Sequence, residues 1–198
     1  MLKKLIAIVS VIAVIVGVGS ALMYKELNPS NSHSVALSRT FSSTEEIVKK
    51  ANVIIKGKVP SEFRQEKVGT VVYNVYEVQV DKLYSNLSDA KITEGESIEL
   101  YRLIGLDLGD NKELANVVDA DYHELEKGEY LLFLSGEYDD ELKKYTYIPN
   151  TPNQLFKMTS SKGLRSNQSD AEFENITEAD ELPSINEADL LEVIESMK

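Results

Sequence analysis

The chain of 198 residues contains no cysteine, no tryptophan and only two histidines, His33 and His123. Without cysteine there is no disulfide framework, no thiolate zinc site, no cysteine nucleophile and no lipid-modified cysteine. The two histidines lie 90 residues apart in the sequence, which leaves little for a histidine metal cluster. The composition therefore excludes several classes of enzyme and metal protein before any pattern is considered.

Positive charge is also scarce, since 21 Lys and Arg side chains stand against 33 Asp and Glu side chains, for a net charge of −12. An acidic chain is repelled by phosphate backbones and by anionic lipid surfaces, so we expect no nucleic-acid partner. The motifs of serine hydrolases, zinc proteases, P-loop proteins and dinucleotide-binding proteins do not occur in the sequence. We therefore predict no catalysis and no cofactor.

One long uncharged run is present, from Leu5 to Met23, in which only two serines are polar. As a helix it would span roughly 28 Å at ~1.5 Å per residue, about the thickness of a hydrocarbon core. Lys3 and Lys4 precede it, so the positive-inside rule places the rest of the chain outside the cytoplasm. An uncleaved anchor is favoured because the apolar cores of signal peptides usually run ~7–15 residues. The alternatives are a signal peptide cleaved after residues 19–21, which would make the protein secreted, and a buried core helix.

Charge and composition divide the chain into five segments. Residues 1–27 hold the anchor or signal peptide and carry a net charge of +2, and the Ser- and Asn-rich residues 28–42 are typical of a tether. Residues 43–159 contain the expected β domain. Residues 160–185 have the composition of an acidic flexible linker, and residues 186–198 that of an amphipathic helix.

The β domain begins with a short helix, predicted by a capping box in which Ser43 is the N-cap and Glu46 is the third helical residue. Strand patterns follow at 52–59, 70–83, 97–104, 129–134 and 144–148, the last with an extension at 155–159. The third and fourth strands are joined by an irregular or partly helical link. This order predicts a mainly β fold, a five-stranded OB-like barrel.

The strand at 70–83 has apolar residues at odd positions up to Val75 and at even positions from Tyr76 onward. A period-2 pattern changes phase when one residue is inserted, so we predict a β-bulge here. The alternative is a strand whose first half is buried on both faces.

The C-terminal helix is expected to begin after Asn186 and to present one apolar face, formed by Leu190, Val193, Ile194 and Met197. At about 11 residues it is marginal alone. It must therefore dock either on its own barrel, which we favour, or on a partner.

Four runs of the domain resemble a class of small exported proteins of Gram-positive bacteria: EEIVKKANVIIKGKV (45–59), YNVYEVQVDKLYSN (73–86), GESIELYR (95–102) and LEKGEYLLFL (125–134). The same layout is similar to the OB-fold, netrin-like barrel of metalloprotease inhibitors. The resemblance implies the barrel but no function, since most such bacterial proteins are uncharacterised. The netrin-like inhibitors depend on an N-terminal cysteine and on disulfides, which this chain lacks, so protease inhibition is not carried over.

Candidate binding residues come from the second and third strands. Tyr73, Tyr76 and Tyr101 fall on these strands and are expected on the face that OB-type barrels use for ligands, to which Arg102 adds a hydrogen-bonding fork. Rings with a polar edge suit sugars, peptides or protein surfaces. The alternative is that these rings fill the core.

A weaker candidate is a metal site in the acidic loop from Asp107 to Glu124, with Asp107, Asp110, Asp119 and Asp121 as oxygen ligands for Ca²⁺ or Mn²⁺. The spacing does not match a calcium loop, so a solvated acidic loop is favoured.

Together these patterns predict an extracytoplasmic binding module, held in the membrane through Leu5 to Met23, that contacts an envelope protein or a wall component. A metal-dependent hydrolase using the loop from Asp107 to Glu124 is the alternative from a different class. An immunity or stress-related envelope protein is a further alternative.

Overall fold

A computed structural model describes residues 41–107, 109, 115–116, 122–149, 151, 154–159, 172–177 and 182–197. The segment from Leu5 to Met23, the tether up to residue 40 and most of the loop at 108–121 lie outside these residues, so what was predicted for them stays a prediction. Within the residues described, no helix is both long and apolar enough to cross a bilayer. This part of the chain is mainly β, with two helices.

Helix α2 (Thr44–Lys50) begins where the capping box predicts it. The Ser43 hydroxyl accepts a hydrogen bond from the backbone N–H of Glu46 at 3.3 Å. The Glu46 carboxylate reaches one residue further back than expected and accepts from the N–H of Ser42 at 3.0 Å. Both bonds satisfy N–H groups that have no partner inside the helix.

The described strands are β1 (Val53–Val59), β2 (Arg64–Val68), β3 (Val71–Asn86), β4 (Ser97–Leu106), β5 (Ala115–Asn116), β6 (Gly128–Asp139), β7 (Lys144–Ile148), β8 (Leu155–Thr159), β9 (Glu172–Asn175) and β10 (Ile185–Asn186). The predicted strands are confirmed as β1, β3, β4, β6 and β7, with the extension as β8. The sequence prediction missed β2, β5, β9 and β10. Strand β9 lies within the segment at 160–185 that was expected to be a flexible linker, so that expectation is wrong for its four residues.

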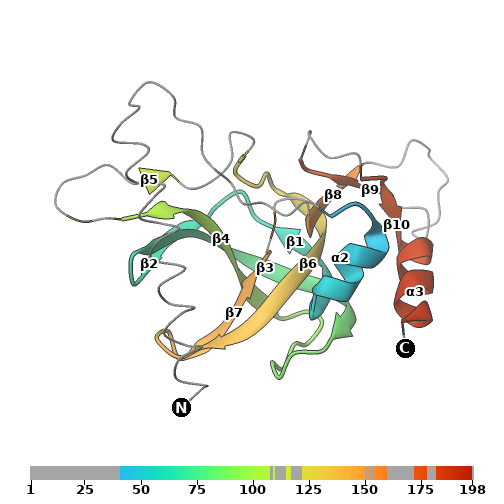
Figure 1. Ribbon diagram of the computed structural model, residues 1–198, viewed down its shortest axis with the longest axis horizontal. Coiled ribbons are helices and arrows are strands. Elements are labelled where there is room, and N and C mark those ends of the chain that lie inside the picture. Colours follow the sequence, from blue (N-terminus) through green and yellow to red (C-terminus); the bar gives the residue numbers. More distant parts are fainter. Residues whose placement is uncertain are drawn as a thin grey trace, which may run out of the picture. The chain divides into compact units, whose positions relative to one another are not determined.

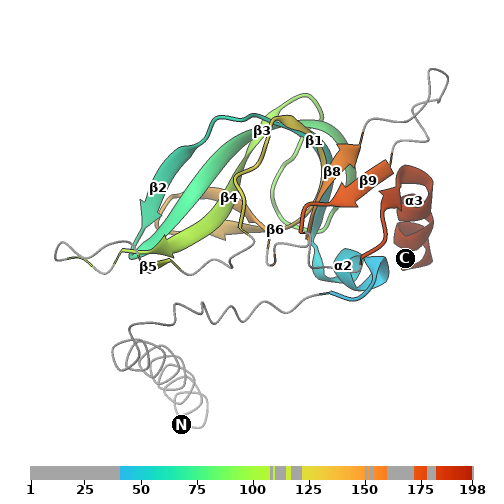
Figure 2. The same ribbon diagram turned by 90° about the horizontal axis from the view of Figure 1, so that it is seen from above.

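Five strands pair in a closed cycle, in the order β1, β3, β4, β7, β6 and back to β1. Four of these pairings are antiparallel, and β4 and β7 run parallel where Leu100 meets Tyr147. Strand β2 pairs with β3, and β8 to β10 extend the sheet from β6. Figures 1 and 2 show β2 at one end of this domain and the two helices at the other.

The β-bulge predicted at Val75 and Tyr76 is wrong, because the register between β3 and β4 is continuous through these residues. The extra residue in that pairing is Ile104 on β4, and β3 carries its own extra residues, Asp81 and Tyr84, opposite β1. Val75 and Tyr76 are both buried. The first half of β3 is therefore buried on both faces, as the alternative stated.

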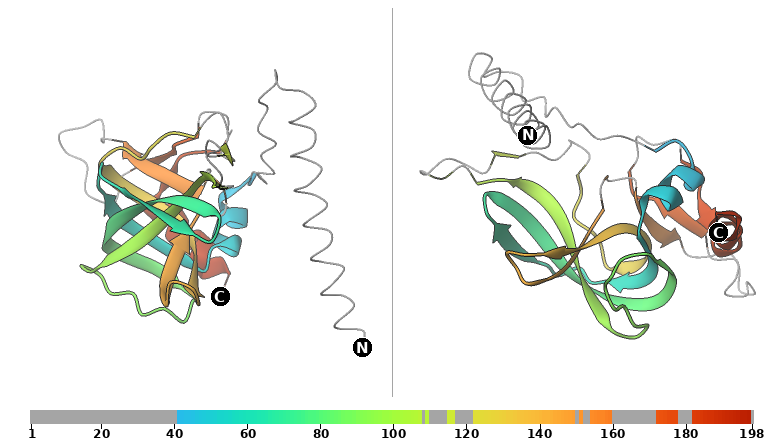
Figure 3. Two further views of the ribbon diagram at one scale, coloured as in Figure 1. Left: turned by 90° about the vertical axis from the view of Figure 1, so that its left-hand side faces the viewer. Right: turned by 60° about the horizontal axis from the view of Figure 1, so that its bottom comes forward.

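Two apolar cores lie on opposite faces of the sheet, because side chains alternate along each strand. On β1, for example, Ile55 belongs to the first core and Ile54 to the second. The first fills the inside of the ring with residues that include Tyr76, Val78, Leu100, Leu132 and Tyr147. The second lies on the outer side of β1 and β6, beneath α2 and α3. Figure 3 shows both helices on the same side of the domain.

Helix α3 (Glu187–Ser196) begins after Asn186, whose side chain accepts a hydrogen bond from the N–H of Asp189 at 2.9 Å. Leu190 and Ile194 are buried in the second core, while Met197 is exposed. The helix therefore docks on its own domain, which confirms the favoured alternative.

Candidate functional site

The four residues predicted to form a binding face lie on two faces of the sheet. In the antiparallel register of β3 and β4, Tyr76 is opposite Leu100 of the first core, and Asn74 is opposite Arg102. Tyr73 and Tyr101 lie at alternate positions and so point to the outer face. The prediction that Tyr73, Tyr76, Tyr101 and Arg102 share one face is wrong, because strand pleating separates neighbours in sequence.

Tyr76 and Arg102 fix the chain at one end of the ring. The hydroxyl of Tyr76 accepts a hydrogen bond from the N–H of Leu125 at 3.1 Å, and Arg102 donates to the carbonyl of His123 at 2.7 Å. The guanidinium of Arg102 also lies 4.3 Å from the ring centroid of Tyr122. Tyr76 and Arg102 are both buried, so they position residues 122–125 and offer no accessible face.

On the outer face, Tyr101 lies beneath a network of four charged side chains. Its hydroxyl donates to Glu99 at 3.1 Å and to Glu66 at 3.2 Å. Arg64 contacts the same two carboxylates at 2.7 and 2.8 Å, and Lys144 contacts them at 2.7 and 3.4 Å. Two cations and two carboxylates thus neutralise one another over a buried tyrosine.

The network shifts the proton affinities of its members. Burial alone would raise the pKa of the Glu99 carboxyl, but the hydrogen bonds from Lys144 and Arg64 outweigh it and hold that pKa below its ordinary value. Burial raises the pKa of Tyr101 to about 12. The Glu99 carboxylate therefore stays charged, and Tyr101 neutral, at physiological pH.

Two neighbouring residues, Tyr73 of β3 and Leu103 of β4, lie beside this network. The ring of Tyr73 meets that of Tyr101 edge-on, with the centroids 5.6 Å apart. Leu103, opposite Tyr73 on β4, keeps 38% of its surface exposed. We call Tyr73, Leu103 and the surrounding network the tyrosine face. The four charged groups of the network balance one another, and beside them the tyrosine face offers an apolar contact on an acidic protein.

Sequence reasoning missed most of the tyrosine face, because Glu66 and Lys144 belong to strands β2 and β7 and lie 78 residues apart. The sequence signal for β2 was weak: its pattern RQEKV is almost wholly polar. Nothing in a single sequence links it to Lys144.

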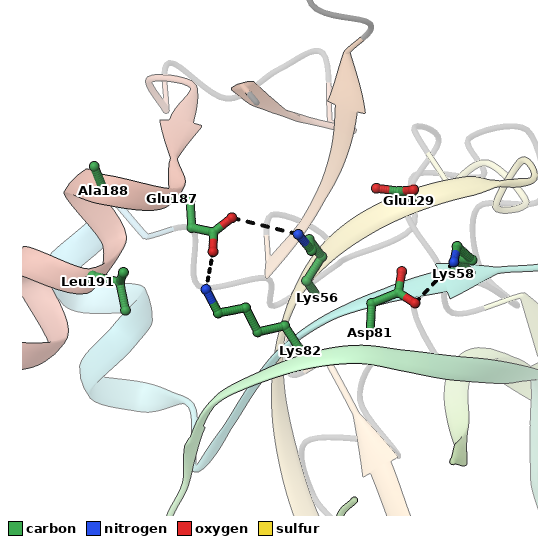
Figure 4. Close-up of a pocket in the computed structure, with 8 residues that line it drawn as sticks. All are labelled: Lys56, Lys58, Asp81, Lys82, Glu129, Glu187, Ala188 and Leu191. Carbon is green, nitrogen blue, oxygen red and sulfur yellow. Dashed lines mark hydrogen bonds and ion pairs between the residues drawn. The ribbon is translucent and has the colours of Figure 1, made fainter. Parts of the chain in front are cut away.

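A groove of about 580 Å³ lies between the first turn of α3 and the strands β1 and β3 (Figure 4). Its lining holds three lysines and three carboxylates: Lys56, Lys58, Lys82, Asp81, Glu129 and Glu187. Lys58 pairs with Asp81 at 3.1 Å, and Glu187 reaches both Lys56 and Lys82. The groove was not predicted from the sequence.

Of the four residues proposed as metal ligands, only Asp107 lies within the described part of the chain. Its carboxylate pairs with Lys67 at 2.6 Å and accepts a hydrogen bond from the N–H of Gly109. Asp110, Asp119 and Asp121 lie outside the described residues. Among the residues that are described, no three His, Asp or Glu side chains gather as a metal site would require.

Comparison with protein-family models, with curated proteins and with solved structures finds no match for this chain.

Proposed function

We propose that this protein is an extracytoplasmic binding module of the cell envelope, anchored in the membrane through Leu5 to Met23, and that its tyrosine face contacts another envelope protein. The observation that carries this proposal is the position of Tyr73 opposite the exposed Leu103 in the register of β3 and β4, beside an internally neutral ion network. Aromatic rings with apolar neighbours, ringed by ordered polar groups, are typical of protein interfaces.

The proposed scaffold for this face is an OB-like barrel. Its support is the strand order of the ring: numbered along the chain, the five strands follow the cycle 1-2-3-5-4-1, with the third parallel to the fifth. OB folds are five-stranded, partly open barrels that bind ligands across their second and third strands. These strands correspond here to β3 and β4, which carry Tyr73 and Leu103.

The membrane anchor is proposed from the uncharged run of Leu5 to Met23 and from Lys3 and Lys4 before it. The absence of cysteine makes this topology testable, because a single introduced thiol is the sole reactive one. Leu87 is 79% exposed and suits this purpose. In Leu87→Cys, a membrane-impermeant maleimide added to intact cells should label the chain without lysis. Labelling only after lysis would place the domain in the cytoplasm and contradict the proposal.

The binding role is tested by capture from solubilised envelope of the source cell. Full-length chain with Leu103→Ser is compared with the matched control Leu191→Ser, because Leu191 on α3 is 39% exposed but lies outside the tyrosine face. We expect a protein that is retained by wild type and by Leu191→Ser and lost with Leu103→Ser. Equal retention by both variants would show that the tyrosine face is not the contact.

A further inference from the structure

The groove beside α3 contains two lysines that lie next to each other on paired strands. Lys56 of β1 and Lys82 of β3 are direct register partners. Like charges directly opposite one another on a sheet are destabilising. The side chain of Lys56 is only 13% exposed, so water screens its charge poorly. This pair requires an anion.

Glu187, the first residue of α3, supplies that anion. One of its carboxylate oxygens lies 3.6 Å from the ammonium of Lys56, and the other contacts the ammonium of Lys82 (Figure 4). Burial alone would raise the pKa of Glu187, but the two lysines outweigh it and lower that pKa. The carboxylate therefore stays charged under mildly acidic conditions, and the contact is not released by a small fall in pH.

The rest of the attachment of α3 is modest. The helix has 10 residues, too few to be stable alone, and only Leu190 and Ile194 of them are buried. The groove opens next to the ion pair, and 40% of the Lys82 side chain is exposed, so small solutes reach it. Lys58 already has its own partner on the sheet, Asp81. Lys56 and Lys82, by contrast, form their ion pairs with Glu187, which belongs to a helix.

We propose that Lys56 and Lys82 form a binding site for an anionic group, a carboxylate or a phosphate, which Glu187 occupies as an internal ligand. An external anion then competes with the docking of α3, so that ligand binding releases the C-terminal helix from the second core. This site is separate from the tyrosine face and does not depend on the proposed function.

Hydrogen–deuterium exchange of the full chain in detergent tests the internal ligand. Glu187→Gln should speed exchange of the α3 amides by about tenfold and leave the β6 amides unchanged. The matched control is Glu192→Gln, an exposed carboxylate on the same helix. We expect it to change α3 exchange by less than about twofold. Equal effects of the two variants on α3, or equal acceleration throughout the domain, would overturn the proposal.

Titration calorimetry tests the external anion, with inorganic phosphate and succinate as probes at constant ionic strength. Glu187→Gln should bind phosphate, succinate or both at least about tenfold more tightly than Glu192→Gln does, because its two lysines lack their carboxylate. Binding of one probe alone identifies the anion class. If neither probe binds Glu187→Gln more tightly than the control, the lysine pair is not an anion site and the proposal fails.

Discussion

Two tyrosines on neighbouring strands are buried to the same degree by different means. Tyr76 inside the ring is 0% exposed and Tyr101 on the outer face is 1% exposed. Tyr76 packs among apolar side chains, including the ring of Phe63, and accepts one backbone hydrogen bond. Tyr101 is covered by charged groups that pair with one another. Equal burial therefore does not mean equal energetics: the inner residue depends on apolar packing, and the outer one on electrostatics that salt and pH can change.

The largest expected effect comes from removing the inner ring. Tyr76→Ala should lower the free energy of unfolding by about 3–5 kcal/mol, because it opens a cavity in the first core. Urea denaturation at low and high salt measures this loss, which we expect to be independent of salt. Tyr138→Ala is the control, since Tyr138 is about half exposed. A loss as small as that of the control would mean that the interior is not close-packed.

Removing only the hydroxyl groups sharpens the comparison. Tyr76→Phe leaves the buried N–H of Leu125 without its acceptor and should cost about 1–3 kcal/mol. Tyr101→Phe removes a donor to two carboxylates that keep Arg64 and Lys144, and should cost about 1 kcal/mol or less. The same denaturation assay compares the two. A greater loss of unfolding free energy for Tyr101→Phe would mean that the outer hydroxyl contributes more to stability than the inner one, against this account.

The charged network around Tyr101 should make the free energy of unfolding depend on pH. The pKa of Glu99 is lowered in the folded state, so its contribution is complete above the unfolded pKa, about 4.3, and is lost as pH falls through the folded value. Glu99→Gln should cost about 1 kcal/mol at pH 7 and progressively less towards pH 3. Thermal unfolding across this range checks the trend.

The control for this pH series is Glu62→Gln, which alters an exposed loop carboxylate. It should change stability little at any pH. A constant difference between wild type and Glu99→Gln from pH 7 to pH 3 would show that Glu99 contributes no charge-dependent stability.

The smallest effect on stability is expected at the proposed contact itself. Leu103→Ser should change the free energy of unfolding by no more than about 0.5 kcal/mol, because the side chain is partly exposed and belongs to neither core. Denaturation of the variant measures this. A loss of several kcal/mol would mean that Leu103 serves the fold, and the capture experiment would then have to use Tyr73→Ser instead.

The sequence predicted helices and strands well where interactions between residues close in sequence determine them. The hydroxyl of Ser43 and the side chain of Asn186 cap the helices as expected. Alternation located the strands of the ring. Strand β9 was missed because its only apolar residue, Phe173, lies among acidic residues. It is buried by the second core, which includes residues of both helices, and no local pattern reports such a contact.

The candidate site was predicted less well, and β3 shows why. Apolar residues on both faces of its first half resembled a change of phase, whereas the outer face is covered by side chains from β2 and β7. Strict alternation along the strand would have separated Tyr73 from Tyr76. The partners Glu66 and Lys144 are fixed by pairing between distant strands, which a single sequence does not reveal.

The most direct test of the tyrosine face is crosslinking in living cells of the source. A photoreactive amino acid is placed at position 103 in one full-length variant and at position 191 in another, two sites of matched exposure on different surfaces. We predict that illumination joins the first variant, and not the second, to one defined envelope protein. Crosslinking of that protein from position 191 alone, or equally from both positions, would contradict the assignment of the tyrosine face as the binding surface.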